Sequence, residues 1–155
     1  MRELQLIAHD IRSLENVGSL FRTCDSLGVA KLWLTGYTAA PPDPRIAKTA
    51  LGAERSVPFE SVPDIAEAFV RLEKEGIPVY ALEITPDAID LADFHAPDRM
   101  ALLLGTETTG IPPSLLERCE GKIKISQRGV KESLNVAVAA GIAAWAILDK
   151  KAFFG

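Results

Sequence analysis

Residues 102–112 read Leu-Leu-Leu-Gly-Thr-Glu-Thr-Thr-Gly-Ile-Pro, an apolar run that leads into a loop bounded by two glycines. The run is short and wholly apolar, which predicts a buried strand. Glu107 is the one carboxylate between Gly105 and Gly110, and the backbone amides of such a loop are able to hold an adenosyl or carboxylate group. The alternative is an ordinary connection between a strand and a helix, with the glycines for turning and Pro112 for starting the helix.

Apolar runs of the same kind recur along the chain and alternate with amphipathic stretches. We expect strands at residues 4–8, 31–34, 57–59, 77–82, 100–104 and 122–125. Alternating strands and helices predict an α/β fold with a mostly parallel sheet and helices on both of its faces. Such sheets bind ligands beyond the carboxyl ends of their strands. Residues 85–99 and the proline cluster within 41–44 are expected to be surface loops.

The first predicted helix contains two polar residues, Asn16 and Arg22, that its core packing does not require. Its apolar residues recur at helical spacing, and Gly28 follows as a left-handed terminator. Gly18 lowers the stability of a helix, so the close approach of another backbone or of a substrate would explain its presence. The alternative is a polar residue at a helix start, a chance glycine and a solvated arginine. The apolar positions are Val17, Leu20, Phe21, Cys24 and Leu27.

Capping signals predict two more helices in the first half of the chain. Asp43 before Pro44 is a capping residue followed by the residue favoured at the first helical position. Ser61 and Asp64 stand at capping-box spacing, which predicts the start of a helix that ends at Gly76.

The last predicted helix spans residues 133–149, and its segment 136–148 is apolar on every side. A sheet would cover only one stripe of this helix, so we expect a homodimer to cover the rest. The alternative is a helix enclosed within one chain. Ser133 or Asn135 could cap the helix, but one cap is enough, so the second polar residue indicates a role at a ligand or in a tight loop crossing.

Composition is that of one globular domain, which we expect to span residues 1–155. Hydrophobic residues make up 48% and charged residues 25% of the chain. The cysteines, Cys24 and Cys119, form no disulfide or zinc pattern, and the first residues lack a signal-peptide pattern, so we expect a cytoplasmic protein without a metal. No G-x-G motif and no P-loop lysine occur, so neither NAD nor ATP binding is indicated.

The net charge of −4, from 17 basic and 21 acidic residues, means that any binding of nucleic acid must be local. Four basic residues fall within ten positions and form a candidate phosphate-facing strip, with a solvated strand edge as the alternative. They are Lys122, Lys124, Arg128 and Lys131.

Together, three segments resemble the SpoU-type branch of the SPOUT class of methyltransferases, which transfer a methyl group from S-adenosyl-L-methionine to a ribose 2′-hydroxyl of tRNA or rRNA. The first is Asn16-Val17-Gly18 with Phe21-Arg22-Thr23, the second Gly105-Thr106-Glu107 with Gly110, and the third Gly129 with Ser133-Leu134-Asn135-Val136. Residues 49–53 with Val57-Pro58 resemble the family's intervening segment. The joint occurrence of these motifs is more specific than any one of them.

The resemblance implies a fold that general rules of topology would not propose, a deep trefoil knot formed by residues 100–148. It implies Arg22 as the catalytic residue, with Asn16, Glu107, Ser133 and Asn135 completing the polar site and some of these residues acting across a dimer interface. Arg22 would either hold the target phosphate and lower the cost of forming the alkoxide, or act as the base where an unusual neighbour permits it. The implied cofactor-binding residues are Leu82, Leu104, Gly105, Thr106, Glu107, Gly110, Ile125, Gln127, Ser133 and Leu134. The implied RNA-binding residues are Arg22, Arg45, Lys48, Lys124, Arg128 and Lys131.

Two features set this chain apart from many members of the family. Ser126-Gln127 stands where a Pro-Met pair is common, which concerns the packing around the adenine. The chain also resembles the minimal members that modify the wobble ribose of tRNA, which implies a methyltransferase domain without the added RNA-binding domain that many relatives carry. An rRNA methyltransferase, an inactive RNA-binding or assembly protein on the same fold, and a metabolic α/β enzyme for another adenine nucleotide are the alternatives.

Overall fold

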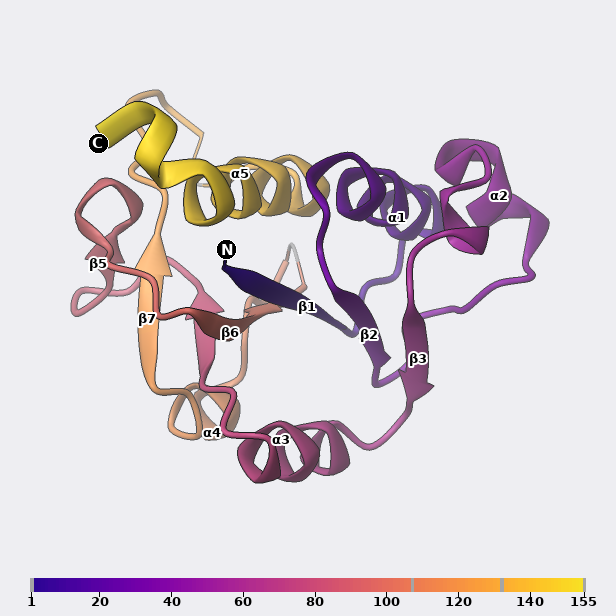
Figure 1. Ribbon diagram of the computed structural model, residues 1–155, viewed down its shortest axis with the longest axis horizontal. Coiled ribbons are helices and arrows are strands. Elements are labelled where there is room, and N and C mark those ends of the chain that lie inside the picture. Colours follow the sequence, from indigo (N-terminus) through magenta and orange to yellow (C-terminus); the bar gives the residue numbers. More distant parts are fainter. Residues whose placement is uncertain (1, 107, 132, 155) are drawn as a thin grey trace.

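The computed structural model describes residues 2–106, 108–131 and 133–154, and shows a sheet between two layers of helices (Figure 1). Seven parallel strands follow the order β3-β2-β1-β6-β4-β7-β5. This confirms the predicted α/β class. The strands are β1 (Glu3–His9), β2 (Lys31–Thr35), β3 (Phe59–Val62), β4 (Val79–Leu82), β5 (Ile89–Asp90), β6 (Arg99–Leu104) and β7 (Gly121–Lys124).

Helices cover both faces of the sheet. In Figure 1, α1 (Leu14–Leu27), α2 (Pro44–Ala50) and α5 (Val136–Phe154) lie on one side, and α3 (Ile65–Lys74) and the short α4 (Pro113–Leu116) on the other. Two 3₁₀ turns, η1 (Ala53–Arg55) and η2 (Leu91–Asp93), complete the elements. No helix in the described part of the chain is long and apolar enough to cross a membrane.

Two hydrophobic cores lie on opposite faces of the sheet, because successive strand residues point to opposite sides. Leu102 and Leu104 of β6 belong to the core under α1 and α5, whereas Ala101 and Leu103 belong to the core under α3. All four are buried, with at most 1% of their surface exposed. A wholly apolar run is therefore what this central strand requires.

Several caps agree with the sequence. Gly28 ends α1 with a left-handed φ of 74°, and Asp43 caps α2, which begins at Pro44. For the third helix, the prediction that Ser61 and Asp64 form a capping box is only half right. Asp64 caps α3, but Ser61 lies in β3, where it pairs with Leu34. A capping-box spacing cannot distinguish a cap from the last residues of a strand.

Several assignments differ from the prediction. The third strand occupies Phe59–Val62 rather than residues 57–59, because the Val57 amide closes the η1 turn on Ala53. The last helix begins at Val136 rather than residue 133, and it is interrupted by non-helical backbone at Asp149 (φ −113°, ψ 21°), its predicted end, before helical structure resumes to Phe154. The stretch 85–99, predicted to be a surface loop, contains β5 and η2, and it buries Leu91 and Phe94.

Candidate active site

A cavity of about 740 Å³ opens at the carboxyl ends of β4, β6 and β7. Three segments form its walls: the residues after β4, the glycine-bounded loop after β6, and the stretch from residue 125 to the first turn of α5. Parallel strands end at the same edge of a sheet, which is why segments far apart in sequence meet here.

The cavity collects the residues expected to bind a cofactor. The nine that the structure describes all line it: Leu82, Leu104, Gly105, Thr106, Gly110, Ile125, Gln127, Ser133 and Leu134. The tenth, Glu107, which is also a predicted catalytic residue, lies outside the described residues.

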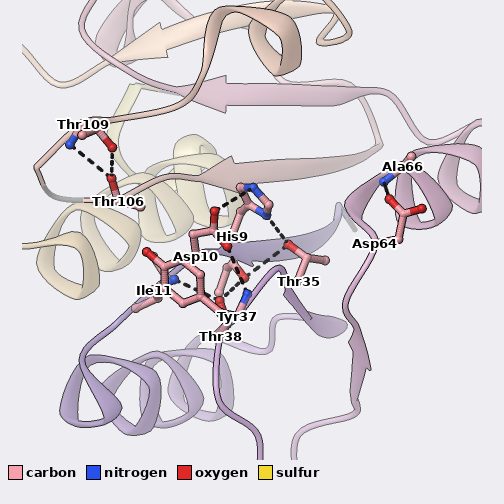
Figure 2. Close-up of polar contacts among 11 residues, drawn as sticks. His9, Asp10, Ile11, Thr35, Tyr37, Thr38, Asp64, Ala66, Thr106 and Thr109 are labelled. Atoms are coloured by element: carbon pink, nitrogen blue, oxygen red, sulfur yellow. Dashed lines mark hydrogen bonds and ion pairs between the residues drawn. The ribbon is translucent and has the colours of Figure 1, made fainter.

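The loop after β6 is held in shape by its own polar groups. Thr106 Oγ1 lies 2.7 Å from Thr109 Oγ1 and accepts the Thr109 amide at 3.2 Å (Figure 2). The Gly110 amide donates to the Thr106 carbonyl at 3.0 Å. A Cβ at Gly105 would lie 2.9 Å from the Gly110 carbonyl carbon and 2.5 Å from the Ile111 side chain. Glycine at position 105 therefore lets the two ends of the loop close on each other.

Glu83 is a residue of this site that sequence reasoning missed. Its Oε2 accepts the Ile111 amide at 2.8 Å, and its own amide donates to the Ile123 carbonyl at 3.0 Å. Gly110 has a φ of 68°, and a Cβ there would lie 2.4 Å from Glu83 Oε2. Glu83 thus ties the end of β4 to the loop after β6 and to β7. Its position directly after a predicted strand was the available signal.

Asn135 connects the cavity to α1. Its side-chain oxygen accepts the amides of Ala137 (2.8 Å) and Val138 (3.2 Å), so it is the cap of α5. Its amide nitrogen donates to Asn16 Oδ1 at 3.1 Å. Ser133 is exposed, lines the cavity and lies two residues before this cap. Of the two capping candidates, Asn135 takes that role and also links two predicted site residues.

Arg22 occupies a different place. It is exposed on α1 and lines a second hollow of about 590 Å³, together with Lys48 and Thr49 from the end of α2. Arg22 is not among the residues that line the larger cavity. Within one chain, Ser133 lines the cavity, Asn135 and Asn16 are joined by their hydrogen bond without lining it, and Arg22 lies in a neighbouring hollow.

The remaining predicted RNA contacts differ in their surroundings. The Arg45 guanidinium pairs with Asp43, the cap of its own helix, at 3.0 Å. Lys124 and Arg128 lie near Asp90, whose pKa is lowered first by a hydrogen bond from Ser126 and also by these two charges. Lys131 is exposed.

The strip of basic residues is partly neutralised in space, although no acidic residue stands within it in sequence. Lys122 donates to Asp87 Oδ2 at 2.7 Å, and Asp90 lies against the same strand. Both acids come from the 85–99 stretch.

Comparison with known proteins places this architecture among enzymes that act on RNA. The model of the SpoU rRNA Methylase family matches residues 3–145. A tRNA (guanosine(18)-2′-O)-methyltransferase of Thermus thermophilus is 31% identical over 140 residues, which are 90% of this chain and 71% of that protein.

Two solved structures extend the comparison. The SpoU methyltransferase AviRb from Streptomyces viridochromogenes in complex with the cofactor AdoMet superposes with a TM-score of 0.89 at 26% identity, over 97% of this chain and 58% of that one. A structure reported as "Structural insights into the 2-OH methylation of C/U34 on tRNA" superposes with a TM-score of 0.86 at 27% identity, over 97% of each chain. The chain thus spans less than two thirds of AviRb and nearly all of the second protein.

Proposed function

The chain belongs to the SpoU rRNA methylase family, and from this we propose that it transfers a methyl group from S-adenosyl-L-methionine to a ribose 2′-hydroxyl of RNA, with tRNA as the substrate. One observation carries the proposal: the second and third motifs meet in one cavity. Asn135 of the third motif then connects them, through its hydrogen bond to Asn16, to the first motif. The C/U34 tRNA structure, matched over 97% of its length, favours tRNA over rRNA.

The cavity fits the cofactor in size and chemistry. Its volume lies within the range of small-molecule sites, ~300–1,000 Å³. Leu82, Leu104 and Ile125 give it apolar walls, while Thr106 and Gln127 give it polar groups. Gly105 and Gly110 stand where a Cβ would clash with the neighbouring wall. When bound, S-adenosyl-L-methionine supplies an electrophilic methyl group on a sulfonium.

The protein's own residues contribute mainly by positioning, because methyl transfer asks for an in-line approach and little covalent help. We assign the ribose to Asn16 and Asn135, whose side chains meet between α1 and α5, and to Ser133, which lines the cavity. Glu107 is assigned to the same polar site. Arg22 holds the target phosphate and lowers the cost of forming the alkoxide, since a guanidinium effectively never loses its proton in proteins and is a poor general base.

We further propose a deep trefoil knot within residues 100–148. The order of strands supports it: β6 lies between β1 and β4, and β7 between β4 and β5, so the chain returns twice into a sheet whose earlier strands are already in place. The loops that follow β4, β6 and β7 then close around the cofactor from three sides.

A homodimer and a local RNA surface complete the proposal. The outward stripe of α5 is the proposed interface, and Arg22 reaches the partner's cavity across it. We assign the phosphate contacts to Lys48, which lines the same hollow as Arg22, to the exposed Arg45, Arg128 and Lys131, and to Lys124 of β7. Two copies double these contacts, which suits an acidic chain that binds RNA locally.

Calorimetry with S-adenosyl-L-methionine, followed by transfer of its tritiated methyl group to total tRNA and to rRNA, tests the function. We expect binding, and label in tRNA that survives alkaline hydrolysis within a dinucleotide, because a methylated 2′-oxygen cannot attack the adjacent phosphate. Label in rRNA alone would select the rRNA alternative. If the protein neither binds S-adenosyl-L-methionine nor transfers the methyl group, the proposed enzymatic function is overturned. RNA binding without transfer would indicate the assembly protein.

A further inference from the structure

Two short loops lie side by side at the carboxyl edge of the sheet, residues 10–13 after β1 and residues 36–38 after β2 (Figure 2). The Tyr37 amide donates to Asp10 Oδ1 at 3.0 Å, and the Ile11 amide donates to Thr38 Oγ1 at 3.0 Å. The Thr38 hydroxyl donates in turn to the Ala8 carbonyl at 3.0 Å. These bonds join the two loops into one unit.

The backbone of this unit is held in an unusual conformation. Asp10 has a left-handed φ of 53°, a conformation that is uncommon outside glycine and that Asp adopts more readily than most other residues. Gly36 has a φ of 62°, and a Cβ there would lie 1.8 Å from Asp10 Oδ1. The His9 imidazole lies between Asp10 and Thr35, with Nε2 3.4 Å from Asp10 Oδ2 and Nδ1 3.0 Å from Thr35 Oγ1. Conformations of this kind persist where the surroundings fix them, and they are common at binding sites.

The unit displays an aromatic ring beside a guanidinium. Tyr37 is 56% exposed, and the Arg12 guanidinium carbon lies 6.0 Å from the centre of its ring. Arg12 is exposed as well. A single exposed aromatic residue needs no explanation. An exposed aromatic face paired with a planar cation on a rigid support is what proteins use to stack unpaired nucleobases.

The position of the pair connects it to the proposed site. Arg12 directly precedes Ser13, the cap of α1, and Asn16 in the same helical turn receives the hydrogen bond from Asn135. β1 pairs with β6 in the register Ala8 to Leu104. The loop after β1 therefore emerges beside the loop that begins at Gly105 and lines the cofactor cavity.

We propose that Arg12 and Tyr37 form a platform on which an unpaired nucleobase of the substrate RNA, next to the methylated nucleotide, stacks. This inference rests on the proposed function, because it assumes that RNA approaches this edge of the sheet. Stacking on a π face tolerates any base, so the platform adds affinity and holds the strand, while it leaves base identity to other contacts.

Tyr37→Ala and Tyr37→Phe test the platform. The hydrogen bond to the Asp10 carboxylate comes from the backbone amide of Tyr37, not from its side chain, so both variants keep the two loops joined. We expect Tyr37→Ala to weaken RNA binding roughly 5- to 150-fold, the range found when one stacked base loses its aromatic partner. Tyr37→Phe keeps the ring but removes the hydroxyl that hydrogen-bonds with Arg12, so it should lose much less affinity than Tyr37→Ala. Affinity for S-adenosyl-L-methionine should be unchanged in both.

Arg118→Ala is the matched control. Arg118 also lies over an aromatic ring, 4.7 Å from the centre of Phe69, but in a hollow at the amino end of β4, away from the cavity. Its replacement should leave RNA binding unchanged, whereas Arg12→Ala should weaken it.

Filter binding of total tRNA gives the dissociation constants without requiring turnover, and the KM for RNA gives a second readout. Unchanged RNA affinity and KM in Tyr37→Ala would overturn the platform, as would a loss confined to kcat or to cofactor affinity. If wild-type protein transfers no methyl group, the proposed function fails, yet weaker tRNA binding by Tyr37→Ala alone would still support the platform.

Discussion

Gly18 lies where α1 and α2 approach each other closely. A Cβ at this position would lie 1.9 Å from Thr49 Oγ1 and 2.4 Å from the Ile46 carbonyl oxygen, so the close approach is that of the α2 backbone. Alanine normally stabilises a helix by ~1 kcal/mol relative to glycine. Here we expect Gly18→Ala to destabilise the fold by about 1–3 kcal/mol, because the helices must separate.

Gly141→Ala is the matched control, since its Cβ would meet only Thr23 Cγ2 at an ordinary 3.7 Å. This variant should be as stable as the wild type or up to ~1 kcal/mol more stable. Urea unfolding followed by circular dichroism measures both, and equal stability of Gly18→Ala and wild type would contradict the packing argument.

Glu60 makes stability depend on pH in the acid range. Hydrogen bonds from Arg71 and Lys31 lower its pKa from 4.5 to about 2. A carboxylate whose pKa is lower in the folded than in the unfolded state stabilises the fold at pH values above its unfolded pKa. This stabilisation is lost as pH falls from about 4.5 to about 2. Its side chain is 37% exposed, so the contribution is at most about 1 kcal/mol.

The variant Glu60→Gln should therefore be less stable than wild type at pH 7 and lose less stability between pH 5 and pH 3. Urea midpoints across this interval measure the difference. Parallel curves for the two proteins would show that the ion pairs contribute nothing.

At the level of elements, Asn135 serves α5 and the site with different atoms of one side chain. Its oxygen caps the helix and its nitrogen bridges to Asn16. Serine caps a helix about as well as asparagine, but its hydroxyl is too short to bridge as well. We expect Asn135→Ser to keep the stability of the wild type, and Asn135→Ala to lose about 1 kcal/mol. Both should lose most methyl transfer.

Thermal unfolding and methyl-transfer rates, measured on the same preparations, separate the two roles. An Asn135→Ser protein with full activity would show that the bridge is dispensable. An Asn135→Ala protein as stable as wild type would remove the capping role instead.

Elements with their own periodicity could be predicted from the sequence, and elements fixed by tertiary contacts could not. The apolar positions of α1 and the run of β6 are visible in the chain itself. β5 has two residues and exists through its pairing with Ile123 and Lys124 of β7. η2 depends on Asp90, which accepts the Ala92 amide. Neither pattern differs locally from a polar loop.

The same distinction applies to the site. The motif residues that we expected to bind the cofactor meet in one cavity, because the strands of a parallel sheet end at the same edge. Glu83 was missed because its partner, the Ile111 amide, is 28 residues away and carries no sequence signal. The separation of Arg22 from the cavity could not be foreseen either, since helical spacing alone places Asn16 and Arg22 near one edge of α1.

For the whole molecule, one apolar stripe of α5 is partly exposed. Ala140, Ala143 and Ala144 are fully buried against the core, whereas three large residues recur at helical spacing on the exposed side. They are Val138 (51% exposed), Ile142 (40%) and Trp145 (37%). A monomer would leave this stripe in water, so we expect a dimer at micromolar concentration.

Ile142→Glu should dissociate this dimer, because it places a charge in the centre of the interface. Val70→Glu is the control, since Val70 is equally exposed (42%) but lies on α3, on the other face of the sheet. Sedimentation velocity measures both variants. A monomeric wild type, or a dimeric Ile142→Glu, would contradict the interface.

A dimer also makes the position of Arg22 testable. If Arg22 reaches the partner's cavity, Arg22→Ala and Asn135→Ser inactivate different halves of each site. A mixed dimer of the two variants then contains one site with both residues intact and one site with neither. Each variant alone should be nearly inactive, while a refolded equimolar mixture should recover about a quarter of wild-type activity, since half the dimers are mixed and each has one good site of two. If Arg22 acts within its own chain, every site in the mixed dimer carries one defect, and the mixture should stay as inactive as its components.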